Sequence, residues 1–175
     1  MRHFILAASL VLTASGAAAQ TAAPSTQTLQ MDSDHATVTA TMSSANARFG
    51  IVAGALQYSP TKPEESTIAL SFDTSSIEEK PARDAFDADH FPEVRISSSA
   101  IARKSGGGEA LPTMVTIRNI TKPVVFQVTF TKVAADVIAM HAEGTVHSAD
   151  FKMSGKGGTI QLVIDAPFNR VGPER

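Results

Sequence analysis

The residues of this sequence that could do chemistry are few, and the first group of them lies near the N-terminus. Asp32, Asp34 and His35 directly precede an alternating apolar and polar stretch, so they would stand at the start of the first strand. There His35 could contact a ligand. The more common role of such residues is to satisfy backbone groups at a strand end.

His141, Glu143 and His147 form the second group. Their even spacing places the three side chains on one face of a strand, where they could bind a metal ion if a neighbouring strand supplied a further ligand. That face lies opposite an apolar one and is therefore the exposed face, on which polar residues are the default. We predict no metal site here.

No arrangement typical of an enzyme stands out elsewhere in the chain. The sequence has no cysteine, which excludes thiol nucleophiles, cysteine metal sites and disulfides. The glycine run "KSGGG" at 104–108 is not a phosphate loop, because no strand precedes it and no Gly-Lys-Ser/Thr helix start follows it. No Ser/His/Asp order and no pair of inward carboxylates is present. We therefore predict a binding or interaction protein, with no catalytic residue and no enzyme cofactor.

Residues 1–19 have the three parts of a secretory signal peptide. Arg2 gives a basic start, an apolar run spans 4–12, and Ala17–Ala19 supply the small residues of a cleavage site. The apolar run is too short to anchor the chain in a bilayer. We expect cleavage after Ala19, export to the periplasm and no transmembrane anchor.

The rest of the chain is predicted to hold one domain. Residues 20–28 are small, polar and interrupted by Pro24, which is typical of a flexible leader. We place the folded domain at 29–168 and a short tail at 169–175. The net charge of −2 offers no basic surface for nucleic acid. Whether the protein forms a homodimer is left open by the sequence.

Apolar and polar residues alternate through most of this domain. Ile68, Leu70 and Phe72 face one way, for example, while Ala69 and Ser71 face the other. This period of two is typical of a half-buried antiparallel strand. Similar runs lie at 37–42, 124–131, 138–147 and 160–165.

Turn signals separate these runs, at 59–63, 104–112 and 154–158. Only the stretch from Glu78 to His90 offers a helical turn, and Pro81 limits where it can start. Several strands with almost no helix predict an all-β sandwich or barrel. Composition does not choose between the two.

A resemblance in one hairpin favours the barrel over the sandwich. The segment "VTIRNITKPVVFQVTF", at 115–130, resembles the signature hairpin of the YceI-like family, which comprises exported, lipocalin-like, polyisoprenoid-binding proteins. Asn119 stands where the family usually has Gly, and Asn is the residue that best replaces Gly at positive φ. We therefore expect a left-handed backbone at Asn119. The matching positions are Thr116, Ile117, Arg118, Thr121, Lys122, Pro123 and Val124.

Three other segments resemble the same family in the same order: 29–38, 86–101 and 146–153. The resemblance implies an all-β fold, a lipocalin-like antiparallel β-barrel of about eight strands with at most a short helical segment. The chain departs from the family pattern at Leu29 and Ala40, where aromatic residues are usual, at Ser44 for a His, at Ser148 for an Arg and at Lys152 for a Gly.

A barrel of this size has an interior wide enough for its own side chains or for one slim ligand. The inward positions carry no charge, and an uncharged, aliphatic tube suits a hydrocarbon chain. The expected lining is Ala40, Met42, Leu56, Ile68, Leu70, Phe72, Val94, Ile96, Ile117, Phe126, Val128, Phe130, Ile138, Met140, Ile160, Leu162 and Ile164.

The resemblance implies a long-chain isoprenoid lipid as partner, of the polyprenyl quinone or polyprenyl phosphate type, which the protein would store or carry in the periplasm. Arg118 and Lys122 flank the signature turn and, with His35, are candidate contacts for its head group; a solvated turn is the simpler interpretation of the two basic residues. The alternative is a filled barrel that acts as an interaction or stress-response protein without a lipid.

The first testable prediction concerns export. The periplasmic fraction should contain a chain that begins at Gln20, because the small-residue site at Ala17–Ala19 is followed by no second apolar span. Intact-mass measurement on that fraction checks this. A full-length chain recovered with the membranes would contradict it.

Overall fold

Most strands bury every second residue, as the alternation in the sequence predicts. The computed structural model describes residues 26–103, 108–153 and 158–172. In β11 (Thr159–Arg170) the even-numbered residues from Ile160 to Phe168 are buried. The other strands are β1 (Gln27–Met31), β2 (Thr37–Thr41), β3 (Asn46–Phe49), β4 (Val52–Tyr58), β5 (Thr67–Asp73), β6 (Glu93–Ser98), β7 (Ala102–Arg103), β8 (Glu109–Ile117), β9 (Ile120–Ala134) and β10 (Val137–His147).

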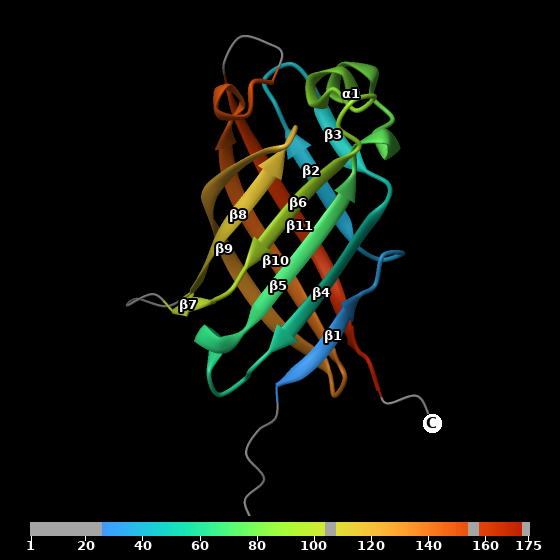
Figure 1. The fold of residues 1–175 in the computed structure, drawn as a ribbon. Coiled ribbons are helices and arrows are strands. Elements are labelled where there is room, and N and C mark those ends of the chain that lie inside the picture. The colour runs from blue at the N-terminus through green and yellow to red at the C-terminus, as the bar shows by residue number, and fades with distance from the viewer. Residues whose placement is uncertain (1–25, 104–107, 154–157, 173–175) are drawn as a thin grey trace, which may run out of the picture.

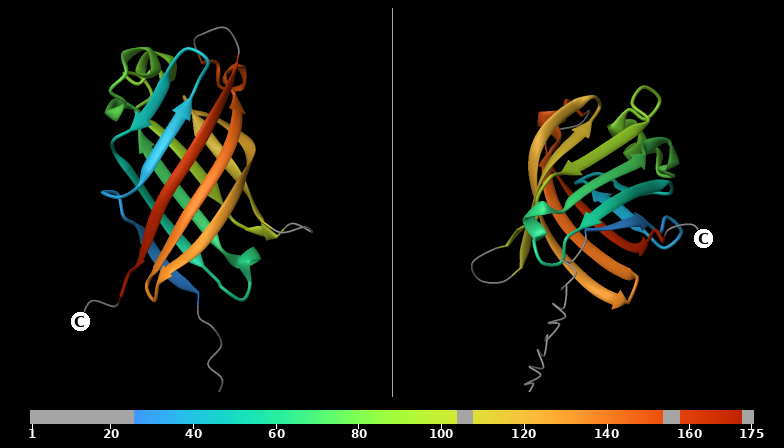
Figure 2. Two further views of the ribbon diagram at one scale, coloured as in Figure 1. Left: turned by 180° about the vertical axis from the view of Figure 1, so that it is seen from behind. Right: turned by 60° about the horizontal axis from the view of Figure 1, so that its bottom comes forward.

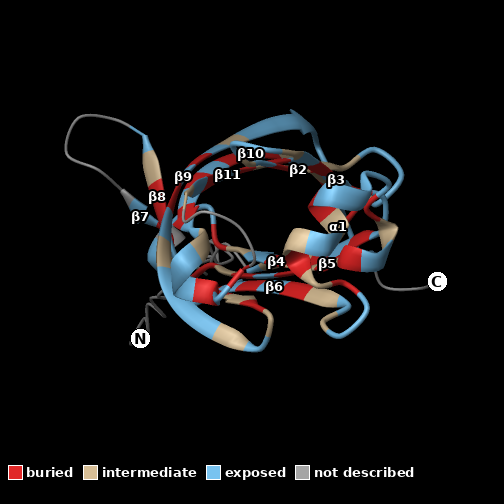
Figure 3. Cartoon of the chain, turned by 90° about the horizontal axis from the view of Figure 1, so that it is seen from above, coloured by how far each residue is buried: buried red, intermediate tan, exposed pale blue. Residues whose placement is uncertain are grey.

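The strands form a closed antiparallel barrel. Eight of them make the ring in the order β1-β4-β5-β6-β8-β9-β10-β11, and β11 closes it by pairing with β1. The ring is seen from the side in Figure 1, from behind in Figure 2 and from above in Figure 3. The prediction of a lipocalin-like barrel of about eight strands is confirmed.

The strands β2 and β3 continue β1 and β4 across two interruptions. β11 pairs first with β2, up to Asp165 opposite Thr37, and then with β1, from Phe168 opposite Met31. The loop 32–36 therefore faces only two residues of β11 and has to bulge outward, in the manner of a large β-bulge. A backbone hydrogen bond of 2.9 Å from Asp32 N to Pro167 O fastens its start.

The helix and most of the helical turns lie at one end of the barrel, which we call the upper end, whereas the turn between β4 and β5 lies at the other, lower end (Figure 1). The helix α1 (Lys80–Phe86) begins with Pro81 in its first turn, where a missing N–H costs nothing. Phe86 is buried against Phe49, with ring centroids 5.6 Å apart. The single helix predicted between Glu78 and His90 is thus confirmed. The 3₁₀ turns are η1 (Pro63–Glu65), η2 (Thr74–Ser76) and η3 (Ser148–Phe151).

The signature hairpin turns on two residues of left-handed backbone. Arg118 has φ +50° and Asn119 has φ +59°, and two successive positive φ values are those of a type I′ turn, which matches the twist of the strands. The expectation for Asn119 is confirmed, whereas a left-handed backbone at Arg118 was not predicted. Lys152, which stands at a second Gly position of the family, is also left-handed, with φ +51°.

Some predicted boundaries differ from the structure by a few residues. β1 begins at Gln27, inside the expected leader, and β11 runs on to Arg170, inside the expected tail, because these ends pair with each other. The turn expected at 104–112 ends by Gly108, since Ala110 and Leu111 are buried in β8. Residues 104–107, residues 154–157 of the next expected turn, and the signal peptide lie outside the described residues.

The second prediction tests the turn. Asn119→Val should lower the free energy of unfolding by about 1 kcal/mol or more, because a β-branched residue resists positive φ. Asn119→Gly serves as the matched control and should be neutral or mildly stabilising. Thermal melts of the three proteins give the comparison. Equal melting temperatures for the wild type and the Val variant would rule out a conformational role for Asn119.

Candidate ligand-binding site

The predicted lining residues gather in one apolar cluster inside the barrel. All of them are buried except Met42 and Phe130, which are half-buried and pack against the cluster. None of the buried residues that the structure describes carries a charge. The cluster also has members that were not predicted, which follow the same alternation or lie in turns, including Leu29, Phe49, Leu111, Val115, Phe151 and Phe168.

Side chains fill the interior of the barrel tightly in this structure. Leu56, Phe72 and Ile117 are 0% exposed, so neither outside solvent nor an internal space the size of a water molecule touches them. Two glycines take part in this packing: a Cβ added to Gly144 would come within 2.6 Å of the Phe126 ring, and one added to Gly54 within 2.5 Å of Leu70. The missing Cβ at each glycine therefore makes room for one large inward side chain.

A pocket of about 270 Å³ opens at the lower end of the barrel. The tilted rings of Tyr58 and Phe130 pack against each other in its lining, with centroids 5.9 Å apart. Lys132 and Asp136 add one charge of each sign. Asp136 also pairs with Arg170 at 3.6 Å. This mouth is apolar in its depth and mixed in charge at its rim.

At the upper end Arg118 holds three segments together, and we call this arrangement the Arg118 clamp. Its guanidinium lies 3.1 Å from the Asp87 carboxylate at the end of α1, donates a hydrogen bond to the carbonyl of Lys152 after η3, and sits 5.3 Å above the ring of Phe91. A hydrogen bond from His90, and then the charge of Arg118, lower the pKa of Asp87. The Arg118 side chain is 20% exposed, and its charge is already paired with that of Asp87.

Lys122, the other basic candidate of the signature hairpin, lies differently. It occupies an inward position of β9, opposite Val115 of β8, yet it is exposed. It forms no ion pair with any other residue that the structure describes. Of the two cations, only Lys122 is available to an anion.

The structure places His35 on the outer wall and not at a mouth. It stands in the bulge between β1 and β2, with a side chain that is 76% exposed. Its Nδ1 lies 3.0 Å from Asp32, and this hydrogen bond raises the pKa of His35. His35 borders a shallow depression of about 300 Å³ that His141 and Asp165 also line.

His141 lies between two carboxylates on the same outer wall. Its Nδ1 is 2.6 Å from Asp165 and its Nε2 is 3.3 Å from Glu143; the bond to Asp165 is the main reason that the pKa of His141 is raised. His147 takes no part in this contact. Within residues 26–103, 108–153 and 158–172, no group of three or more His, Asp or Glu side chains is arranged to hold a metal ion.

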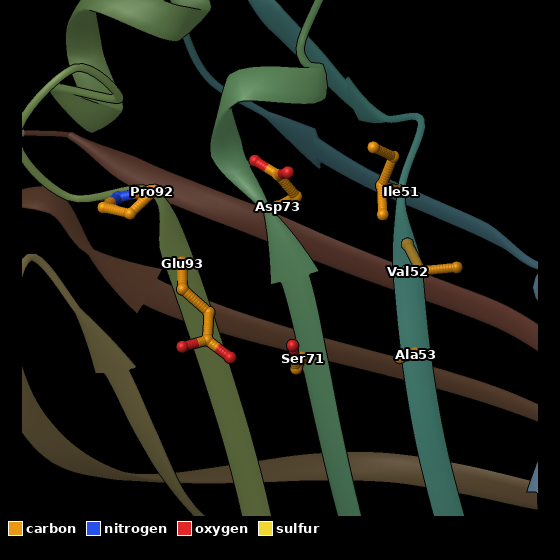
Figure 4. Close-up of a pocket in the computed structure, with 7 residues that line it drawn as sticks. All are labelled: Ile51, Val52, Ala53, Ser71, Asp73, Pro92 and Glu93. Carbon is orange, nitrogen blue, oxygen red and sulfur yellow. The ribbon is translucent and has the colours of Figure 1, made fainter.

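Two further hollows lie outside the barrel. One, of about 300 Å³, is drawn in Figure 4, where Glu93 and Ser71 stand on neighbouring strands. Hydrogen bonds from Arg95 and then Ser71 lower the pKa of Glu93, and Asp73 caps η2 through Ser75 N at 2.7 Å. The other, of about 870 Å³, lies between the β2–β3 hairpin and the residues before α1. The polar groups drawn in Figure 4 thus serve the protein's own hydrogen bonds.

The closed ring of eight antiparallel strands and its apolar interior place the chain in the class of lipocalin-like β-barrels. Within that class, the model of the YceI-like domain matches residues 24–168, and the chain belongs to the YceI-like family. No match was found among curated protein sequences. No helix in the described part of the chain is long and apolar enough to cross a membrane.

Solved structures share this fold at low sequence identity. BcnA from Burkholderia cenocepacia is 18% identical, with a TM-score of 0.70 over 78% of this chain and 98% of that one. A polyisoprenoid-binding domain from Saccharophagus degradans, implicated in plant cell wall breakdown, is 10% identical, with a TM-score of 0.62 over 84% of this chain and 100% of that one. The YceI protein of Campylobacter jejuni is 15% identical, with a TM-score of 0.55 over 71% and 86%.

The third prediction concerns the Arg118 clamp. Arg118→Met should lower the free energy of unfolding by about 1–3 kcal/mol, since it removes charged hydrogen bonds that are only partly exposed, and should speed amide exchange at 84–91 and 148–152. Arg95→Met is the control, because the Arg95 side chain is 69% exposed and exposed ion pairs contribute little. Equal, small losses in both variants would contradict a structural role for the clamp.

Proposed function

We propose that this protein binds an isoprenoid-chain lipid inside its barrel and stores or carries it in the periplasm. The observation that carries the proposal is the interior itself, an apolar cluster that extends from Leu29 near the lower end to Phe86 at the upper end, with no charged residue among the described residues that are buried. Membership of the YceI-like family supports it. So does the fold shared with a domain described as polyisoprenoid-binding.

The interior can supply enough free energy for such a ligand. Burying the five carbons of one isoprene unit contributes on the order of 3 kcal/mol at most, so a few units account for a tight complex. The length of chain accepted would then depend on the depth of the barrel. Polyprenyl quinones and polyprenyl phosphates both meet this requirement.

Binding requires the packed side chains to make room. Met31, Met140 and Met153 are buried in the cluster, and unbranched, flexible methionine adapts its shape to irregular spaces more easily than other apolar residues. Phe126 and Leu70 are large side chains that pack directly on the backbone of Gly144 and Gly54. We expect these residues to move when the lipid enters.

A second candidate function follows from the same packing. Inward side chains at 0–3% exposure, such as Leu56, Leu70 and Phe72, are also those of a filled barrel that acts through its surface, as an interaction or stress-response protein. Ala40, Ser148 and Lys152, which depart from the family pattern, fit such a change of role. The two functions differ in one measurable respect, which is whether a lipid is retained.

The fourth prediction separates them. Native mass spectrometry of the protein, incubated with vesicles that contain polyprenyl phosphate or polyprenyl quinone, should detect a discrete lipid adduct. Leu70→Trp should abolish the adduct because the ring occupies the space of the chain, and overpacking should lower the melting temperature by several degrees.

Ala69→Trp is the matched control. Ala69 is the neighbour of Leu70 in β5, but its side chain is exposed on the outer face, so this variant should retain the lipid. No adduct on the wild type, with either lipid, would contradict lipid binding and favour the filled barrel.

A further inference from the structure

The ladder between β9 and β10 stops halfway up the barrel. The two strands pair from Ala134 opposite Val137 up to Gln127 opposite Glu143. Above this level the residues 120–126 of β9 pair with β8, and the residues 144–147 of β10 pair with β11, but no pair joins the two segments in this fully described part of the chain. The wall of the barrel is interrupted here.

We call this interruption the lateral window. Its lower edge is the ring of Phe126, which lies against Gly144. Its upper edge is the Arg118 clamp, which joins the signature hairpin to the carbonyl of Lys152 after η3. The turn η3 itself contacts both β9 and β10. Phe126, at the lower edge of the window, belongs to the apolar cluster inside the barrel.

The β9 side of the window presents backbone donors. In a hairpin with a two-residue turn, the pair next to the turn, here Ile117 and Ile120, exchanges both hydrogen bonds, and the following pairs alternate. The N–H groups of Thr121 and Val125 then point away from β8 and toward the window. Pro123, between them, has no N–H to leave unpaired, which fits an open strand edge.

The inward face of β9 changes from apolar to charged along the window. Phe126 is 1% exposed, Val124 is half-buried and Lys122 is exposed. Val115, which pairs with Lys122 on β8, is 0% exposed, so Lys122 lies beside a fully buried apolar side chain. This change from buried apolar residues to an exposed lysine along β9 matches a molecule with a hydrocarbon tail and an anionic head.

The other end of the barrel is less suited to an anion. Lys132 is the corresponding cation at the lower mouth, but Asp136 lines the same pocket. At the upper end Asp87, the carboxylate of the clamp, is paired with Arg118 and His90. At the window, Lys122 forms no ion pair with any other residue that the structure describes.

We propose that the lateral window holds the phosphate head group of a polyprenyl phosphate, with Lys122 and the N–H group of the adjacent Thr121 as its contacts and with the isoprenoid chain passing Phe126 into the barrel. This inference rests on the proposed function and makes it more specific, since it selects an anionic lipid over a quinone.

The fifth prediction compares two ligands that differ only in the head group, farnesyl phosphate and farnesol. Lys122→Gln should weaken the affinity for farnesyl phosphate by about tenfold or more, because a hydrogen bond to a charged group is lost, and should leave the affinity for farnesol within about twofold. Lys132→Gln is the matched variant, since it changes the same residue type on the same face of β9 at the opposite end; there both affinities should stay within about twofold.

Each other outcome has a distinct meaning. A larger loss for Lys132→Gln, or the same affinity of the wild type for both ligands, would overturn the window as head-group site while lipid binding stands. Inorganic phosphate that binds as tightly as farnesyl phosphate, in a manner that depends on Lys122, would indicate a site for the free anion and overturn the lipid assignment. A wild type that binds neither farnesyl ligand contradicts the proposed function itself. Unchanged melting temperatures of both variants would exclude misfolding as the cause of a loss.

Discussion

The closure of the barrel depends on β11, which pairs with three strands. It runs beside β10 along nearly its whole length and holds β2 and then β1 on its other edge. Because β1 and β2 share that edge with a loop between them, the loop is forced outward. The position of His35 on the outer wall, the continuity of the ring and the enclosure of the apolar cluster all follow from this one pairing arrangement.

The enclosed cluster is the main source of stability in a chain without cysteine. Large and small residues alternate across it, as where Phe126 meets Gly144 and Leu70 meets Gly54. This complementarity is typical of a well-packed core. It also means that any guest in the interior has to exchange contacts with side chains that are already satisfied, so that binding and internal packing compete for the same space.

The local features of this fold could be predicted from the sequence, and the non-local ones could not. Alternation identified the inward face of β5 and β9, and one Asn at a turn predicted its left-handed backbone, because both depend on neighbours along the chain. The partners of Arg118 lie in segments distant in sequence, so nothing local indicated that it is paired. Lys122 occupies an inward position, but its exposure arises from the end of the β9–β10 ladder, which is a property of two strands together.

The pairing of β1 with β11 also constrains how the chain can reach its native state. These strands come from opposite ends of the domain, with Leu29 opposite Arg170, so the ring is completed only after the entire chain has been made. The hairpin of β8 and β9 has a two-residue turn and can form early, whereas long-range strand pairing is intrinsically slow. Until β11 arrives, β1 remains an edge strand that any other extended chain can pair with. The risk of aggregation for this protein is thus concentrated in the interval before closure, and the N-terminal strand is the segment most in need of a chaperone.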